Sequence, residues 1–571
     1  MSILVNNKLI ARANLGVSFI AALALVAGCT GDDGERGAQG PEGQQGVPGI
    51  PGAPLDRDLP TIDKAFAGAG GKAIVDTVTH FSYKAAGSRL ISGEGFSARD
   101  SSAEASTFDV TVSYDIANDK LRVDWARSIL FVGGVPLNYS DIIDGNKGMV
   151  VGDDDIFPDA PGVDNKDMTG QRWGTTRKEA RLLSPHVILK EISGNRDIAT
   201  QAGIGFFNGT IHELLEVDDS PFPVTLWVNA GSGEVSRITT KENDHLHRDV
   251  ELEVHYADYQ DHAGLLIPHE VVIVRDGQVL HIEQRSEFQL NPAFDATLFD
   301  FPAGATPPDV VMADVFNGEL SHQFNAGFLG LGIPQDFFQE AVIAANEVPT
   351  AGSGVVHITG GSHHTMLVRQ TNPNRVIVVE APLYPERSEQ IIAKSEELFP
   401  GVPITHVIAT HHHEDHSAGL RAFVNIGATV VVQKNSEFFF REIFRAPSTI
   451  SPDALAAAST PPAINIQTVA DGGEFRLDDA GTPDNTVRAI HFDNGHCNDM
   501  LMIHVQSINA VFQSDLWNPD GDSNGVGLFP PFIAQFRDAI VAQNFNPAVT
   551  LLIGGHGATG TFADLDNKAN Q

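Results

Sequence analysis

The chain has 571 residues, more than one hydrophobic core usually organises, so two or more domains are expected. Its formal net charge of −36 disfavours binding to nucleic acids or anionic lipid surfaces, because both carry negative charge. The only two cysteines are Cys29 and Cys497, which excludes a fold held together by several disulfides.

The first residues have the pattern of a secretory targeting segment. Two basic residues precede an apolar run at 15–27 that is short for a membrane span. The run ends in the sequence VAGC, which resembles the lipobox of bacterial lipoproteins. The resemblance implies a signal peptide at 1–28 and a lipid anchor on Cys29. Because Thr30 follows instead of Asp, it also implies an outer-membrane lipoprotein on the periplasmic or cell-surface side. An ordinary signal peptide or membrane anchor with an unrelated cysteine is the alternative.

A repetitive segment at 31–54 follows, made of eight uninterrupted Gly-X-Y triplets. Glycine at every third position is what the axis of a collagen triple helix requires. Eight triplets make a marginal helix, so we favour a flexible spacer that lifts the following domains off the membrane. A short trimerising stalk is the alternative. The anchor, this collagen-like spacer and a linker together occupy 29–72.

Residues 73–303 read as a β-rich domain. Alternating apolar residues predict a hairpin of strands 108–114 and 120–125. Five more strands are expected at 225–230, 235–239, 250–256, 269–275 and 278–283, and one helix at 177–189.

The run ELEVHYADYQDHAGLLIPHEVVIV and the closing LFDFPAGA resemble the half-barrel domains of the outer-membrane lipoprotein carrier and sorting family. The resemblance implies an open β-sheet curled around an apolar groove. A generic β-domain that only supports its neighbour is the alternative. Residues 304–349 are less periodic and are interpreted as a connector, or as a loop folded over the next domain.

The pattern changes at 350–571 to alternating strands and helices. Strands are predicted at 376–380, 403–409 and 428–432, and helices at 386–399 and 417–425. This βαβαβ order indicates an α/β layer structure.

A histidine-rich motif follows the strand at 403–409. The sequence THHHEDHSAG contains His411-x-His413-x-Asp415-His416. It resembles the HxHxDH motif of the metallo-β-lactamase superfamily, which implies an αββα sandwich. Imidazole and carboxylate groups are ligands that zinc accepts in catalytic sites. The tight loop can point the first two histidines at one ion and turn Asp415 and His416 toward a second.

Three further residues match the superfamily's order, and each follows an apolar strand, where loops converge to build sites: His496, Asp515 and His556. The resemblance implies that His411, His413 and His496 bind a first metal ion. It implies that Asp415, His416 and His556 bind a second, and that Asp515 bridges the two. The implied cofactors are two zinc ions, with iron or manganese as alternatives.

Two positions narrow the chemistry. Position 413 is His, whereas redox di-iron members of the superfamily use Glu there. Position 515 is Asp. In this respect the chain resembles hydroxyacylglutathione hydrolases, lactonases and phosphodiesterases, whereas true β-lactamases usually carry Cys or Ser at this position. The resemblance implies hydrolysis by a metal-bound hydroxide, with Asp415 as both a ligand and the catalytic residue that orients it.

The sequence therefore predicts an extracytoplasmic dinuclear zinc hydrolase for a small-molecule ester, lactone, thioester or amide. One alternative is a phosphodiesterase on the same metals, which would want basic residues near the site, where the metal loop offers only Arg421. The other is a lipid- or lipoprotein-binding module with an accessory hydrolase domain. Candidates for contacts around the metal ligands are Thr410, Ser417, His363, His364 and Cys497, the last also as a thiolate near the metal.

Overall fold

The computed structural model describes residues 58–130, 134–154, 165–218, 223–311, 343–360, 363–518, 530–545, 548–549 and 551–570. The predicted signal peptide, Cys29 and the Gly-X-Y segment lie outside these residues, as does most of the predicted connector. From Pro54 onward the chain forms one compact unit. Among the described residues, no helix is long and apolar enough to cross a membrane.

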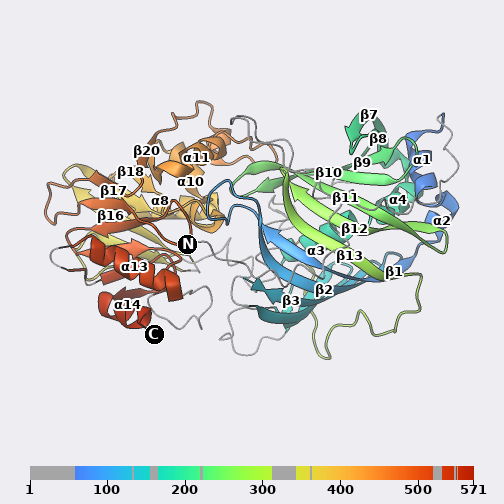
Figure 1. Cartoon of the computed structure of the whole chain (residues 1–571), viewed down its shortest axis with the longest axis horizontal. Coiled ribbons are helices and arrows are strands. Elements are labelled where there is room, and N and C mark those ends of the chain that lie inside the picture. The colour runs from blue at the N-terminus through green and yellow to red at the C-terminus, as the bar shows by residue number, and fades with distance from the viewer. Residues whose placement is uncertain are drawn as a thin grey trace, which may run out of the picture. The chain divides into compact units, whose positions relative to one another are not determined.

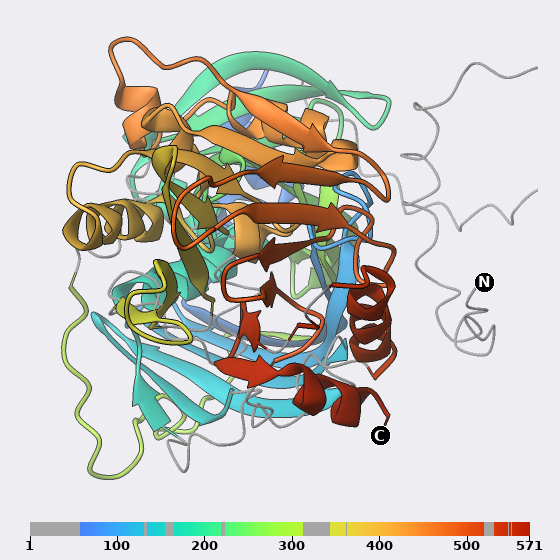
Figure 2. The ribbon, with the colours of Figure 1, turned by 90° about the vertical axis from the view of Figure 1, so that its left-hand side faces the viewer.

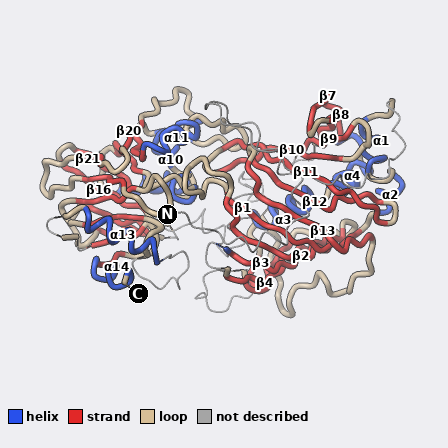
Figure 3. Tube along the Cα trace, viewed as in Figure 1, coloured by secondary structure: helices blue, strands red, loops and turns tan. Residues whose placement is uncertain are grey.

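The first part of the described chain is dominated by strands (Figure 3). They form one antiparallel sheet of 13 strands, built from two meanders, β1 to β6 and β7 to β13, that join where β1 pairs with β13 (Figure 1). The strands are β1 (His80–Ile91), β2 (Ala103–Asp115), β3 (Lys120–Ile129), β4 (Val135–Asp144), β5 (Lys147–Asp153), β6 (Asn165–Asp167), β7 (Ala199–Phe207), β8 (Thr210–Val217), β9 (Val224–Asn229), β10 (Val235–Asp244), β11 (Arg248–His262), β12 (Leu265–Arg275) and β13 (Gln278–Leu290).

The predicted hairpin is present as β2 and β3, with Asp115 opposite Lys120. Phe108, Val110 and Val112 are buried on the same face of β2, as the alternation of a half-buried strand requires. The five later strands are also found, within β9 to β13. A large β-rich region is therefore present, whereas a half-barrel remains a prediction.

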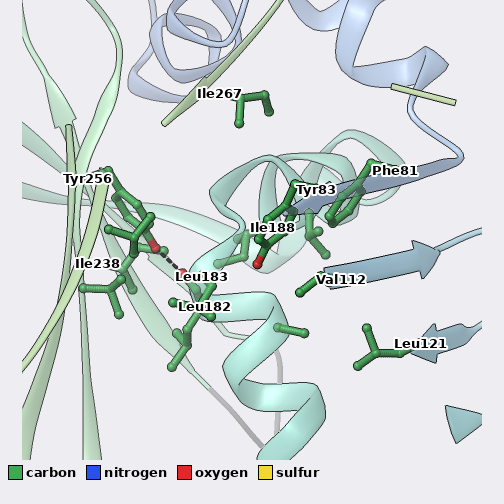
Figure 4. Packing of buried hydrophobic residues seen from close by; sticks show 14 of the residues in the cluster. Phe81, Tyr83, Val112, Leu121, Leu182, Leu183, Ile188, Ile238, Tyr256 and Ile267 are labelled. Carbon is green, nitrogen blue, oxygen red and sulfur yellow. Dashed lines mark hydrogen bonds between the residues drawn. The ribbon is translucent and has the colours of Figure 1, made fainter. Parts of the chain in front are cut away.

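The prediction of a single helix at 177–189 is wrong, because two helices occupy this stretch: α3 (Gly170–Leu183) and α4 (Pro185–Gly194). Pro185 ends α3, since it has no N–H to donate, and it suits the first turn of the next helix. The two helices pack against the sheet (Figure 4), where the Tyr256 hydroxyl donates to the carbonyl of Leu182. Two shorter helices precede β1: α1 (Thr61–Gly68) and α2 (Lys72–Thr77).

The rest of the described chain contains two sheets. The seven-stranded sheet runs in the order β14 (Ala344–Glu347), β15 (Val355–Thr359), β16 (Thr365–Thr371), β17 (Asn374–Val379), β18 (Ile404–Ile408), β19 (Thr429–Gln433) and β20 (Ile466–Val469). The six-stranded sheet runs β21 (Glu474–Leu477), β22 (Val487–His491), β23 (Leu501–Val505), β24 (Ala510–Gln513), β25 (Leu551–Gly554) and β26 (Thr559–Thr561). The helices are α8 (Pro385–Leu398), α9 (Glu414–Ser417), α10 (Leu420–Asn425), α11 (Glu437–Ile443), α12 (Ala454–Ala457), α13 (Pro530–Ala542) and α14 (Phe562–Ala569).

Alternating side chains of the strands divide this region into layers. Val376 and Val378 of β17 pack with α8, α10 and α11, whereas Ile377 and Val379 point into the core between the two sheets. The outer face of the six-stranded sheet packs against α13 and α14, drawn in red in Figure 2. The result is a helix–sheet–sheet–helix sandwich, as the sequence predicts.

The strands β17, β18 and β19 are parallel, so their carboxyl ends meet at one edge. The predicted helix at 417–425 begins earlier than expected, since α9 starts at Glu414 inside the motif and α10 follows from Leu420. Gly419 lies between them, and glycine is needed there because a Cβ would lie 2.2 Å from the Ser388 hydroxyl oxygen. The motif loop is thereby held tightly against α8.

Candidate metal centre

Four loops, after β18, β22, β24 and β25, bring the seven predicted metal ligands together. The described residues that could hold a metal ion form three groups, and two of these groups together contain all seven ligands. One group consists of His411, His413, His496 and Asp515, and the other of His363, Asp415, His416 and His556. The sequence prediction divided the other six ligands in the same way, but it gave Asp515 to both ions, whereas Asp515 is a member of the first group only, and His363 is an additional member of the second.

Asp515 stands between the two groups. Its Oδ2 lies 3.0 Å from His411 Nε2 and 3.2 Å from His496 Nε2. Its Oδ1 lies 2.9 Å from both His416 Nε2 and His556 Nε2. The backbone φ of Asp515 is +64°, which is uncommon for a residue other than glycine and concentrated at functional sites. Each carboxylate oxygen thus faces a different group, as a bridging ligand must.

The spacing of the ring nitrogens fits a metal ion. His496 Nε2 is 3.1 Å from His413 Nδ1, and His556 Nε2 is 3.2 Å from His416 Nε2. Nitrogen ligands about 2.0–2.1 Å from a tetrahedral zinc ion are separated by roughly 3.3 Å. In addition, Asp415 Oδ1 is buried without a hydrogen-bond partner among the described residues. The donor set therefore suits divalent cations, and either group could hold one.

The electrostatics of the second group favour a positive charge. Burial lowers the pKa of His416, but the carboxylates of Asp415, Asp515 and Glu380 outweigh burial and raise that pKa well above its usual value. Burial also lowers the pKa of His363 to about 3, so this imidazole is neutral, the form that binds metals. A metal ion bound by the second group would compensate the negative charge of the same carboxylates.

Contacts behind the imidazoles fix which ring nitrogen faces the centre. The Nδ1 of His416 lies 3.1 Å from Glu380 Oε2, so its Nε2 faces Asp515. The Nδ1 of His411 lies 3.1 Å from the hydroxyl of Thr410, as the sequence suggested. Ser417, the other candidate, instead donates to the backbone carbonyls of His412 and His413.

Sequence reasoning did not single out Glu380. This carboxylate is fully buried at the end of β17 and accepts a hydrogen bond from the Thr410 hydroxyl at 2.5 Å. A charged residue that closes the apolar run Val376–Val379 is the signal that could have found it.

A loop of the 13-stranded sheet also reaches the centre. Between β1 and β2, the carbonyl of Gly95 lies 3.0 Å from His413 Nε2, which leaves Nδ1 of that ring facing His496. Glu94 Oε1 accepts from the backbone N–H of Glu414 at 3.1 Å, and Glu94 forms the third possible metal group with His413 and Asp415. No motif in 73–303 indicated this contact.

The remaining candidates differ in position. His363 Nε2 lies 2.9 Å from Asp415 Oδ2, inside the centre. The ring of His364 instead lies 4.9 Å from that of His357, and it belongs to none of the metal groups found among the described residues. Cys497 is buried in the apolar cluster that includes α13, and burial raises the pKa of its thiol well above the usual value, which disfavours the thiolate.

Residues 358–486 match the family model described as the metallo-beta-lactamase superfamily. These residues are a metallo-beta-lactamase superfamily domain. The matched segment of the superfamily domain includes the histidine-rich motif, and it supports a metal-dependent hydrolase. No curated protein matches the chain.

Solved structures similar to the chain include three bacterial metallo-β-lactamases. Those from Hirschia baltica and Erythrobacter litoralis are each 16% identical with a TM-score of 0.30, and the matches cover 40% of this chain and 96% and 95% of theirs. That from Pontibacter korlensis is 14% identical with a TM-score of 0.29, covering 40% of this chain and 98% of its own.

Proposed function

We propose that this protein is a dinuclear metallohydrolase that cleaves a small neutral ester, lactone, thioester or amide. The observation that carries the proposal is the position of Asp515. One of its carboxylate oxygens lies about 3 Å from two imidazole nitrogens of the first group, and the other lies about 3 Å from two imidazole nitrogens of the second group. Two divalent ions held there, which we propose to be zinc, would supply Lewis acidity and a water made nucleophilic near neutral pH.

The protein's own residues would orient the reaction. His363 Nε2 holds Asp415 by one oxygen, so the other oxygen, Oδ1, is available to accept the proton of the attacking water. His496 and His556 are about one fifth exposed, 20% and 21%, whereas His411 and His416 are fully buried. Substrate would therefore approach from the side of His496 and His556.

The charges around the centre favour a neutral carbonyl substrate over a phosphodiester. Arg421, the basic residue nearest in sequence, is engaged elsewhere: it donates to the Asp453 carboxylate and the Ile443 carbonyl. The side chain that reaches the centre from the loop between β1 and β2 is Glu94, an acid. Burial and the carboxylates of Asp415 and Glu414 raise the pKa of Glu94 well above its usual value, so this side chain is no source of positive charge for an anionic substrate.

We further propose that the enzyme acts outside the cytoplasm, carried by a lipid on Cys29 at the outer membrane, with the Gly-X-Y segment as a spacer. The VAGC sequence at 26–29 and the eight triplets support this placement. Mass spectrometry of the membrane-extracted protein tests it, because a diacylated Cys29 as the first residue is expected and an unmodified N-terminus would contradict it.

The function is tested by elemental analysis together with a panel of lactone, thioester, phosphodiester and β-lactam substrates. We expect about two metal ions per chain, hydrolysis of a neutral carbonyl substrate, and loss of both turnover and metal in His413→Ala. The matched control is His406→Ala, a change of the half-buried histidine on β18 that belongs to neither group. Metal-free protein with all seven ligands intact would overturn the proposal.

A further inference from the structure

A cavity lies within the 13-stranded sheet region, between α3 and the strands β1 to β4. None of its lining residues belongs to the metal centre. The space open to the centres of water molecules is about 60 Å³. At ~10–15 Å³ for each water, roughly four to six waters fit, so the cavity accommodates an organic molecule of similar size.

One arginine in this cavity has no acidic partner. Arg127 is only 5% exposed, and its guanidinium donates to the Tyr139 hydroxyl at 3.2 Å and the Ser106 hydroxyl at 3.0 Å. Both acceptors are neutral, and no carboxylate pairs with Arg127 among the residues that the structure describes. Burying a guanidinium without a counter-charge is costly, so the site favours an anion.

The other charged groups around the cavity compensate one another. The other cations that line the cavity or contact its lining carboxylates are each paired with an acid. Arg89 pairs with Glu179, and Arg285 pairs with Glu283. Arg172 pairs with both Asp141 and Asp154, and Lys166 also pairs with Asp154. One positive charge, on Arg127, therefore remains for a monoanion to balance.

Unused hydrogen-bond donors point to the same place. Within the described residues, three buried polar atoms of cavity-lining side chains have no hydrogen-bond partner: Nε of Arg89, Nε of Arg127 and Oγ1 of Thr175. Buried polar groups are rarely left without partners in native proteins. Two N–H groups and a hydroxyl around one space call for an acceptor with more than one oxygen.

The remaining lining is apolar. Val110, Val112 and Val123 come from the sheet and Leu183 from α3, and the Trp125 ring lies beneath the Arg89 guanidinium at 4.8 Å. An occupant therefore meets a charged end and an aliphatic wall. A planar carboxylate on a short alkyl chain matches both, because its two oxygens suit the geometry of a guanidinium.

We propose that this cavity is a binding site for a small organic monocarboxylate, held by Arg127 and Thr175. The proposal does not depend on the hydrolase function, because no metal ligand lines the cavity.

Titration of the purified full-length protein with sodium propionate, followed by isothermal calorimetry, tests the proposal. We expect saturable one-site binding that weakens at least tenfold in Arg127→Met, since hydrogen bonds to a charged group are lost. The matched control is Arg122→Met, on the same strand β3. Arg122 pairs with Asp124 and does not line the cavity, so wild-type affinity is expected.

Two further variants keep the test decisive if Arg127→Met does not fold. Thr175→Val removes one donor with little change of shape and should weaken propionate binding several-fold. Val123→Phe fills the cavity while Arg127 stays, and should abolish binding. The proposal is overturned if propionate does not bind saturably, if these variants bind it as the wild type does, or if inorganic phosphate binds and propionate does not.

Discussion

The buried carboxylate of Glu380 offers a quantitative test of how the metal centre is built. Glu380→Gln keeps the shape of the side chain but removes the charge that faces His416 Nδ1 at 3.1 Å. Hydrogen bonds to charged groups contribute about 1.5–3 kcal/mol. At 1.4 kcal/mol for each factor of ten, metal binding at the His416 group should weaken roughly 10–100-fold. Losses of this size are typical when the partner of a metal-bound histidine is changed.

Competition with a chromophoric chelator measures this affinity for each ion. Asp499→Asn is the matched control, because Asp499 is equally buried and lies 2.8 Å from His412 Nδ1, a histidine outside both metal groups. Asp499→Asn should lower the free energy of unfolding while metal affinity stays within a few-fold of the wild type. Wild-type affinity in Glu380→Gln, or an equal loss in the control, would refute the reasoning.

Two further changes test other parts of the structure. Asp515→Ala should reduce the metal content below one ion per chain and abolish hydrolysis, because the Asp515 carboxylate contacts histidines of both groups. A variant that still binds two ions would show that Asp515 is not a bridge. Burial lowers the pKa of His186, in the core beside Phe81, to about 3. An unfolded histidine binds a proton below about pH 6.5. The contribution of His186 to the free energy of unfolding is therefore fully present above that pH, and it falls by up to about 1.4 kcal/mol for each pH unit toward pH 3. Between pH 7 and pH 5, the loss of unfolding free energy measured with urea should be about 2 kcal/mol smaller in His186→Leu than in the wild type, and equal losses in both proteins would contradict this assignment.

The sequence predicts that the candidate metal ligands come together, because these residues follow apolar strands. His411, His496 and Asp515 each come just after a buried run, and strand ends of a layered fold meet at one edge. By contrast, Gly95 acts through its backbone carbonyl, which a side-chain motif does not record. Glu380 is 36 residues from His416, its partner, and no local spacing connects them.

The 13-stranded sheet shows a different limit of what can be predicted from the sequence. Strand β7 has exposed or half-exposed residues throughout, so no alternation of buried and polar positions marks it in the sequence. Periodicity finds β2 and β11, which bury one face each, but it does not give the pairing of β1 with β13 that joins the two meanders. That pairing depends on long-range packing.

The loop between β1 and β2 affects how the protein can be divided. A fragment starting at 350 would keep all seven metal ligands, yet water would replace the Gly95 carbonyl at His413 Nε2, and the Phe96 carbonyl that accepts from the Asn498 N–H would be lost. In such a fragment the imidazole of His413 would be less firmly oriented. We therefore expect that a piece with an intact centre must include the loop between β1 and β2, and that amino-acid changes in this loop affect the centre without altering the sandwich.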